Sequence, residues 1–300
     1  MQNRSKQHPS TMLGGLAVCT VVALTACASG DDTTSAAPNP LTTIRSRLTD
    51  NPDVEVFRVS SDTESYWRLT VLPAFDGEGW RVPESELEYI GDVAGRPPEG
   101  HEIRQEIEVQ ALDGSLVPVA PEPIQASSPA DELRWSEALG ALFTTTDLAS
   151  GDRFEIVSRS PDYSAQKLRT ATTDDPPGAG HVALPNAVPA VLAETARAIT
   201  ADAATDYDRL LMLQRWFRTE FEYSLEVQAG HGYSAAEGLL RTRVGHSEQF
   251  ASAFAVLART LGMPSRVAVG FSPGELRSDG RYSVDNRHSH AWPEIWFDGL

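Results

Sequence analysis

The chain has 300 residues, of which 41% are hydrophobic and 22% are charged. This composition is that of an ordinary globular protein and excludes a wholly disordered chain. Its 42 acidic residues outnumber 25 basic ones, which gives a formal net charge of −17 at pH 7. Such a charge repels phosphate backbones and anionic headgroups, so nucleic acid is excluded as the expected partner.

Residues 1–27 are expected to be a signal peptide. Arg4 and Lys6 precede an apolar run at 13–24 that is too short for the ~20 residues of a membrane span. The run ends in Leu-Thr-Ala-Cys, which resembles the lipobox of bacterial lipoproteins. We therefore expect lipidation of Cys27 and an exported protein anchored on the outer face of the cytoplasmic membrane or in the cell envelope. An ordinary signal peptide with an incidental cysteine is the alternative.

The cysteine content limits the chemistry that the protein can perform. The only two cysteines in the sequence are Cys19, within the apolar run, and Cys27, at the proposed lipidation site. Cleavage before Cys27 would leave a mature chain without a disulfide or a free thiol. A mechanism that needs a thiolate is therefore excluded for the mature protein.

After the signal peptide, a flexible linker is expected at 28–40, where small and polar residues end in prolines. The segment 41–168 is predicted to form a β-rich domain, because strand-like segments there are separated by clusters of Pro, Gly and Asp. Its clearest strands are predicted at 54–59, 102–109 and 153–158.

From 169 to 300 the hydrophobic period becomes helical before further strands follow. Helices are predicted at 187–200, at 206–221 and from Ser247 to Gly262. In the third helix, the residues at helical spacing predict one buried face: Phe250, Phe254, Leu257 and Leu261. Strands are predicted at 265–271, 281–286 and 289–297. Helices followed by a sheet indicate an α+β fold.

The segment GHSEQFA at 245–251 places Ser247 in the first turn of a buried helix. Backbone N–H groups and the helix dipole stabilise negative charge at that position, which favours a cysteine thiolate. A serine hydroxyl is a far weaker acid and needs a general base in the transition state. The alternative interpretation of Ser247 is a helix N-cap without chemistry.

Two longer segments resemble the bacterial transglutaminase-like domain, a relative of papain-like cysteine proteases: VGHSEQFASAFAVLARTLGMPSRVAVGFSPGE and YSVDNRHSHAWPEIWFDG. The family pattern is G-x-C-E-Q-F-A, then R-x-L-G-x-P-x-R-V, then H-A-W-x-E. YWRLTVLPAFDGEGW at 66–80 resembles the β-rich segment that precedes this unit outside the membrane in large membrane proteins of the family. The resemblance covers 41–300 and implies a papain-like core of helices packed on an antiparallel sheet, preceded by a β-rich domain.

The resemblance also implies roles for individual residues. In the family a cysteine attacks a glutamine carboxamide or peptide carbonyl, and an amine or water resolves the thioester. By position, Ser247 stands where that cysteine belongs, and His290 takes the role of the base. Substrate contacts are implied for three neighbours of these residues: His246, Gln249 and Trp292.

No cofactor or metal is expected. His288 and His290 are expected to lie two apart on one strand, and His246 adjoins the helix start. However, no cysteine and no further spaced ligand set accompanies these histidines.

The acid of the family's triad lies on the strand after the histidine, and the chain ends at Leu300, so the core is expected to be incomplete at its C-terminus. On an extended strand Asp298 would lie ~26 Å and Glu294 ~13 Å from His290, so neither is expected to reach it. Asp285, before a turn, is the remaining candidate.

The sequence therefore predicts an extracytoplasmic transglutaminase-like protein that keeps the scaffold, lacks the thiol and is catalytically inactive or impaired. Its expected partner is a peptide, protein or cell-envelope polymer. The lipid anchor would also attach the protein to the membrane surface. The alternative is an active acyl hydrolase or transferase in which His290 deprotonates Ser247. A serine introduced to trap a substrate complex also stays open.

Overall fold

The computed structural model describes residues 41, 43–82, 100–129, 132–185 and 187–300, which belong to one compact unit. The predicted signal peptide, Cys27 and the linker at 28–40 lie outside the described residues. In the part of the chain that is described, no helix has both the length and the apolar character needed to cross a membrane.

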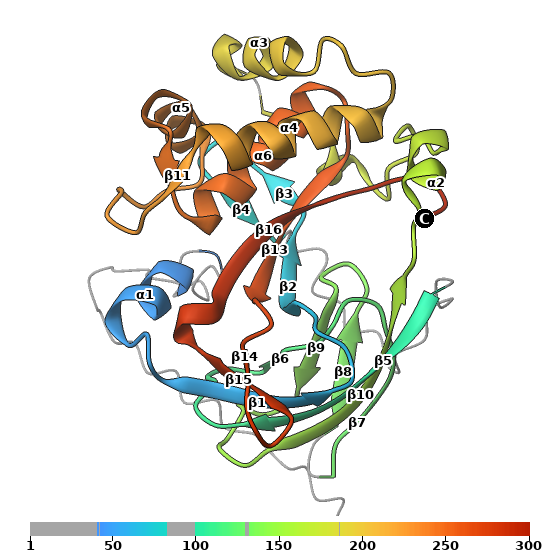
Figure 1. Cartoon of the computed structure of the whole chain (residues 1–300), viewed down its shortest axis with the longest axis vertical. Helices are drawn as coiled ribbons and strands as arrows, with labels where there is room; N and C mark the ends of the chain where they lie inside the picture. The colour runs from blue at the N-terminus through green and yellow to red at the C-terminus, as the bar shows by residue number, and fades with distance from the viewer. Residues whose placement is uncertain (1–40, 42, 83–99, 130–131, 186) are drawn as a thin grey trace, which may run out of the picture. The chain divides into compact units, whose positions relative to one another are not determined.

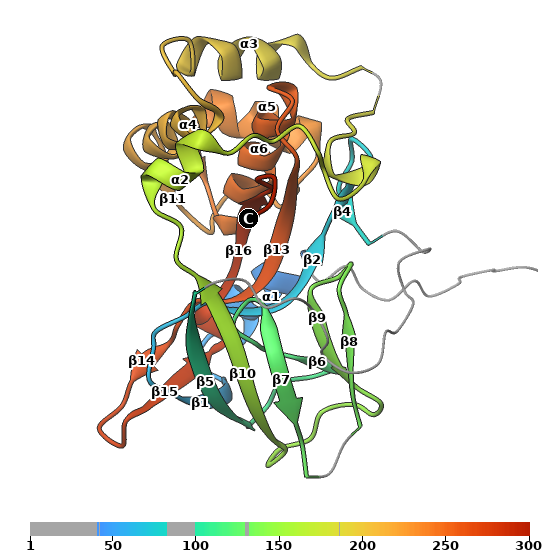
Figure 2. The same ribbon diagram turned by 90° about the vertical axis from the view of Figure 1, so that its right-hand side faces the viewer.

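A six-stranded antiparallel sheet forms the larger β structure (Figures 1 and 2). Its order is β14-β15-β1-β5-β10-β7. The strands are β14 (Glu275–Leu276), β15 (Arg281–Asp285), β1 (Glu55–Ser61), β5 (Gly100–Val109), β10 (Arg153–Pro161) and β7 (Pro123–Ser127). Along β5, Ile103, Ile107 and Val109 are buried at alternate positions, because successive side chains point to opposite faces. The predicted strands at 54–59, 102–109 and 153–158 are confirmed as β1, β5 and β10.

A three-stranded antiparallel sheet of order β16-β13-β2 carries the C-terminal motif. Its strands are β2 (Trp67–Leu72), β13 (Ser265–Phe271) and β16 (Ser289–Ile295). Since β2 joins β13 here, while β15 pairs with β1 in the larger sheet, the segments 41–168 and 169–300 share both sheets. Strands from the first half of the chain therefore lie beside strands from the second half in both sheets.

The remaining strands are short. They are β3 (Ala74–Phe75) with β4 (Trp80–Arg81), β11 (Glu222–Tyr223) with β12 (Val244–Gly245), and β6 (Leu116–Val117), β9 (Ala141–Thr144) and β8 (Leu133–Ser136). The helices are α1 (Thr43–Asp50), α2 (Ala165–Thr170), α3 (Ala190–Ile199), α4 (Asp206–Glu220), α5 (Tyr233–Thr242) and α6 (Ser247–Thr260), with 3-10 turns η2 (Ala179–His181) and η3 (Asn286–His288). The helices predicted at 187–200, at 206–221 and from Ser247 are confirmed as α3, α4 and α6.

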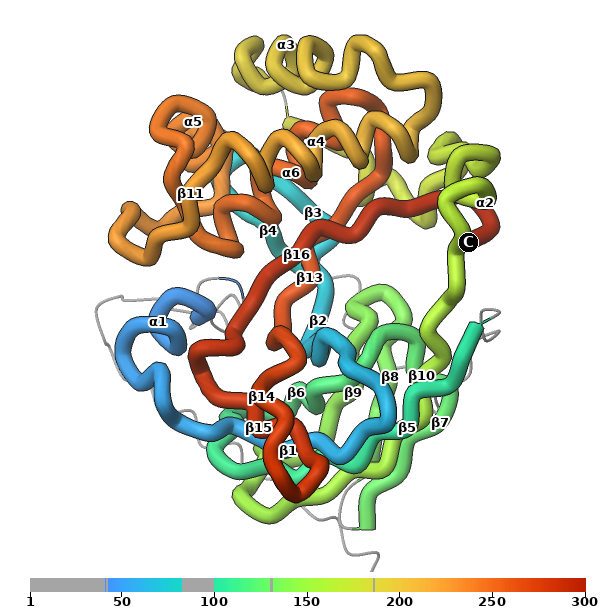
Figure 3. The backbone as a smooth tube through the Cα atoms, viewed as in Figure 1, coloured from blue at the N-terminus to red at the C-terminus, as the bar shows by residue number. Residues whose placement is uncertain are grey.

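Helix α6 is the central helix of the core (Figure 3). It contacts α3, α4 and α5 as well as β13 and β16, so most of its circumference is buried. The prediction of a single buried face is therefore wrong: Phe250 and Phe254 are only half-buried, whereas the small residues of the other faces are fully buried. Those small alanines and serines allow neighbouring elements to approach closely. Gly262 follows the helix at φ +85°, as expected for its end.

Strands β2 and β13 approach closely at Gly270. A Cβ atom there would lie 2.1 Å from the carbonyl oxygen of Trp67, so no other residue fits without a backbone shift. Across β13, Gly270 is also paired with His290 of β16. This glycine therefore permits the close approach of β2 to the strand that is paired with His290.

Candidate active site

Ser247 is the first residue of α6, and its side chain is buried, with 3% of its surface exposed. The N-cap is His246, which has an extended backbone conformation. Its backbone N–H donates to Oε1 of Gln249 at 3.4 Å. Among the described residues, the Ser247 Oγ atom has no hydrogen-bond partner. The interpretation of Ser247 as the helix N-cap is therefore wrong. The hydroxyl lies in the first turn, where a nucleophile would gain most from the helix dipole.

His290 is the second residue of β16, and β16 packs against α6, the helix that begins with Ser247. Burial lowers the pKa of His290 from 6.5 to about 4, so the imidazole is neutral at pH 7. In the described part of the chain no hydrogen bond joins this imidazole to the Ser247 hydroxyl, which is unpartnered there. The two motif residues thus lie on packed elements without forming the nucleophile–base contact of a serine enzyme.

Two aromatic side chains lie against His290. Trp292, on the same face of β16, is nearly parallel to the imidazole, with ring centroids 6.2 Å apart and an interplanar angle of 19°. Tyr66, from the segment before β2, has its ring centroid 5.6 Å from that of His290 and 5.1 Å from that of Trp292. The sequence carries no signal for this role of Tyr66, because no periodic pattern connects it to a residue in the other half of the chain.

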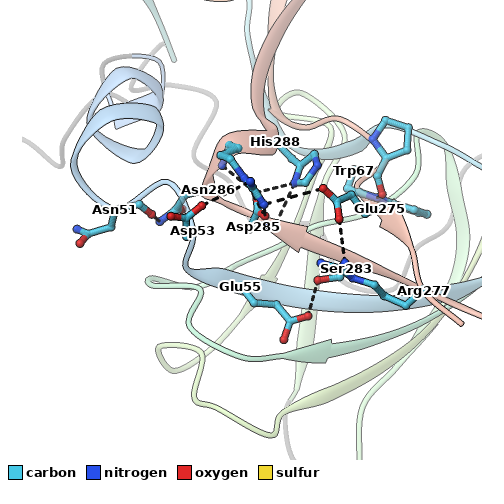
Figure 4. Close-up of polar contacts among 12 residues, drawn as sticks. Asn51, Asp53, Glu55, Trp67, Glu275, Arg277, Ser283, Asp285, Asn286 and His288 are labelled. Carbon is cyan, nitrogen blue, oxygen red and sulfur yellow. Dashed lines mark hydrogen bonds and ion pairs between the residues drawn. The ribbon is translucent and has the colours of Figure 1, made fainter. Parts of the chain in front are cut away.

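The acid upstream of the H-A-W motif contacts a different histidine. Asp285 caps η3, accepts the backbone N–H of Arg287 at 3.0 Å and has Oδ1 2.8 Å from Nδ1 of His288 (Figure 4). Burial would raise the pKa of Asp285, but the hydrogen bond from Arg287 and the nearby His288 hold it below its usual value. His288 belongs to η3, so the prediction that it lies on one strand with His290 is wrong.

The two acids after His290 are engaged elsewhere, in agreement with their predicted exclusion. Glu294 accepts from Nε of Arg266 at 2.7 Å and from Nη1 of Arg68 at 3.2 Å. Burial alone would raise the pKa of Glu294, but the two arginines outweigh it and lower the pKa to about 2. Asp298 accepts from the Thr172 hydroxyl at 2.5 Å and from two backbone N–H groups of the same segment.

A buried carboxyl follows Ser247 directly. Glu248 is 1% exposed, and burial raises its pKa from 4.5 to about 7, with Arg45 opposing the shift. Its Oε1 lies 4.0 Å from Nε2 of His231, while its Oε2 has no hydrogen-bond partner within the described ranges. His231 in turn accepts the backbone N–H of Trp80 through Nδ1 at 3.3 Å. The glutamate of the first motif was the only signal in the sequence that could have pointed to this pair.

The other two implied substrate contacts point into the protein. His246 is fully buried, neither ring nitrogen has a partner among the residues described, and burial, assisted by Arg45, lowers its pKa to about 4. The Gln249 side chain donates from Nε2 to the carbonyl of Gln228 at 2.9 Å and thereby anchors the segment before α5. Their contact with a substrate stays a prediction. Within the described residues, no group of three His, Cys, Asp or Glu side chains is arranged as metal ligands would be.

Two family models match the chain. The TgpA N-terminal domain matches residues 12–165, and the transglutaminase-like superfamily core matches residues 193–300. A protein-glutamine gamma-glutamyltransferase of Pseudomonas aeruginosa is 27% identical over 77% of the chain, and the uncharacterized protein YebA of Bacillus subtilis is 22% identical over 81%. The aligned regions cover 33% and 36% of those proteins, so the chain spans about a third of the length of the curated relatives it matches.

Solved structures show the same fold. The periplasmic domain of TgpA from Pseudomonas aeruginosa matches with a TM-score of 0.64 and 21% identity, covering 84% of this chain and 86% of that one. The same domain bound to ethylmercury matches with a TM-score of 0.63 and 22% identity, covering 86% and 90%. The predicted α+β fold, a transglutaminase-like core preceded by a β-rich region, is thereby confirmed. Since the TgpA N-terminal model alone matches half of the sequence, the chain belongs to the bacterial transglutaminase-like family of the TgpA type.

Proposed function

We propose that this protein is an extracytoplasmic, transglutaminase-like binding protein with little or no catalytic activity. Its ligand is a peptide or a cell-envelope polymer, held in the site inherited from the enzymes of the family. One observation carries the proposal: the position of the nucleophilic cysteine is occupied by Ser247, whose buried Oγ has no hydrogen-bond partner among the described residues.

The state of the histidine supports the same conclusion. A serine nucleophile needs a base that removes its proton in the transition state, and such a base works best with a pKa near the working pH. Burial holds the pKa of His290 at about 4, which makes its imidazole a weak base. A cysteine thiolate would not depend on that base in the same way, because the helix N-terminus itself favours the charged form.

An active acyl hydrolase or transferase is the second candidate. It is favoured by the neutral imidazole of His290, since a neutral imidazole can accept the proton of Ser247. In that mechanism Ser247 would attack an ester or amide and form an acyl-enzyme, which water or an amine would resolve. The absence of an Oγ hydrogen bond in the described part of the chain argues against it.

The relatives support an extracytoplasmic location. The solved domain of TgpA is described as periplasmic, and a curated relative is named a protein-glutamine gamma-glutamyltransferase. We propose that the present chain likewise acts outside the cytoplasm and that lipidation of Cys27 holds it at the membrane surface. Glutamine-containing peptide is then the first ligand to examine.

Binding of a fluorescent glutamine-containing peptide, followed by anisotropy, tests the proposal. Ser247→Ala should leave the affinity unchanged, whereas Trp292→Ala should weaken it several-fold, because Trp292 lies beside His290 and is only half-buried. Trp296→Ala is the matched control, since Trp296 follows β16 and its indole N–H donates to Asp298. Equal affinities for the Trp292→Ala and Trp296→Ala variants, or loss of binding in Ser247→Ala, would contradict the proposal.

A further inference from the structure

The segment Asp62 to Tyr66 connects β1 to β2 and contains no helix or strand. Its last residue, Tyr66, directly precedes Trp67, which is fully buried and donates its indole N–H to the carbonyl of Pro273 at 3.0 Å. The hydrogen bond of Trp67 and the close approach of the strands at Gly270 hold the backbone next to Tyr66 in place. The β-rich half of the chain therefore holds Tyr66 beside β16.

The three rings form one cluster. Because the rings of His290 and Trp292 are nearly parallel on one face of β16, the Tyr66 ring, tilted by 38° and 57° to them, packs against both. The indole of Trp292 is held in place by Glu294, because its Nε1 donates to Oε1 of that residue at 3.3 Å. Tyr66 itself is 44% exposed, so it is the outermost member of the cluster.

We propose that Tyr66 is a positioning residue for His290. Its ring covers the imidazole, keeps water from it and holds it in place beside Trp292. The site of this protein is therefore composite: the transglutaminase-like core supplies Ser247 and His290, and the β-rich half supplies the cover. This inference does not depend on whether the site binds or reacts, because it concerns the environment of the imidazole alone.

Within the described ranges, burial is the sole cause of the lowered pKa of His290, and no charged neighbour there contributes to it. The charged or titratable side chains on the surrounding described elements are Arg45, Arg47 and Asp50 of α1, Asp62, Glu64 and Tyr66 before β2, Arg68 of β2, Glu248 and Arg259 of α6, Arg266 of β13, Arg287 and His288 of η3, and Glu294 of β16. Uncovering the imidazole should therefore change its titration through solvation rather than through charge.

An NMR titration of the imidazole C–H signals in the purified protein tests this proposal. His290 should titrate near pH 4 in the unmodified chain and in Tyr66→Phe, which keeps the ring. In Tyr66→Ala the midpoint should rise by about one unit or more toward the value of an exposed imidazole, ~6.5. Tyr163→Ala is the control, because that tyrosine is also partly exposed but lies over Lys167. An unchanged midpoint in Tyr66→Ala would overturn the proposal.

A second measurement is the rate at which diethyl pyrocarbonate, a reagent for neutral imidazole, modifies His290, with exposed His101 as the internal reference. Peptide mass analysis assigns the modified residue. Relative to His101, the rate at His290 should rise several-fold in Tyr66→Ala and in Tyr66→Leu, and it should stay low in Tyr66→Phe. Since Tyr66 is almost half exposed, these variants should fold. Equal relative rates in all variants would contradict a covering role.

Discussion

Trp80 donates its indole N–H to the Ser252 hydroxyl at 2.9 Å, so a residue of the β-rich half is bonded to the central helix one turn beyond Ser247. Trp80 is fully buried, and Arg259 of the same helix lies over its ring at 4.6 Å. The Ser252 hydroxyl in turn donates to the carbonyl of His231. The start of α6 is therefore held in place by residues from both halves of the chain.

Trp80→Phe should lower the free energy of unfolding by about 1–3 kcal/mol, because the variant loses the hydrogen bond to Ser252 and leaves a gap beside Arg259. Urea denaturation measures the change. Trp296→Phe is the control and should stay within about 0.5 kcal/mol, since Trp296 is exposed. Equal stabilities of the two variants would show that the contact with α6 contributes nothing.

Ser247→Ala should leave the stability unchanged or raise it by up to about 1 kcal/mol, because it removes a buried hydroxyl that has no partner among the described residues. Thr205→Ala provides the contrast. Thr205 is the true N-cap of α4, accepting the Asp208 N–H through Oγ1 at 3.1 Å, and its loss should cost about 1 kcal/mol. A comparable loss in Ser247→Ala, measured in the same urea series, would show that Ser247 acts as a cap after all.

Glu248 should make stability fall with increasing pH. Its pKa is raised by burial to about 7 in the folded chain, above the unfolded value near 4.5, so the folded state binds the proton more tightly. The stability contributed by the neutral carboxyl is then fully present below pH 4.5 and is lost as the pH rises through 7.

Glu248→Gln should remove this dependence. Between pH 5 and 8, the unmodified protein should lose about 2 kcal/mol relative to the variant, as urea titrations at several pH values would show. Glu226→Gln, at an exposed position, should run parallel to the unmodified protein. A constant difference between Glu248→Gln and the unmodified protein across this range would refute the assignment.

The stability that Glu294 contributes should have the opposite pH dependence to that of Glu248, and Glu294→Gln removes this contribution. The pKa of Glu294 is lowered to about 2, so its contribution is present above pH 4.5 and lost as the pH falls toward 2. At pH 7 the substitution should cost about 3 kcal/mol, because the Arg68 side chain is 2% exposed and would lose its closest carboxylate. Glu275→Gln, in an exposed pair with Arg277, should cost less than about 1 kcal/mol. The cost of Glu294→Gln should disappear at pH 2; an equal cost at both pH values would show that the ionised carboxylate does not stabilise the fold.

The sequence predicted the elements that carry the motifs, because their periods and end signals are local. The helix from Ser247 to Gly262 and the strand at 265–271 are examples. It could not predict that α6 is buried on most sides, since small alanines and serines give no amphipathic signal. Nor could it predict the cover on His290 by Tyr66, because that contact depends on how β2 pairs with β13.

The polar pairings around the site were equally hard to foresee. Asp285 is close to His290 in sequence, yet the 3-10 turn after β15 directs it to His288. Glu248 was visible in the motif, but its burial follows from the packing of α6 against its neighbours. Such contacts are set by tertiary structure and leave no pattern in a single sequence.

Mass spectrometry after incubation with an activated acyl ester at neutral pH shows whether the site lost its nucleophile when it lost the thiol. The unmodified chain, Ser247→Ala and Ser247→Cys would be compared, with peptide analysis to separate residue 247 from Cys19 and Cys27. We expect an acyl adduct at position 247 in Ser247→Cys only, because the first turn of α6 favours a thiolate there. An adduct on Ser247 of the unmodified chain, absent from Ser247→Ala, would contradict this expectation and identify the protein as a serine acyl hydrolase or transferase.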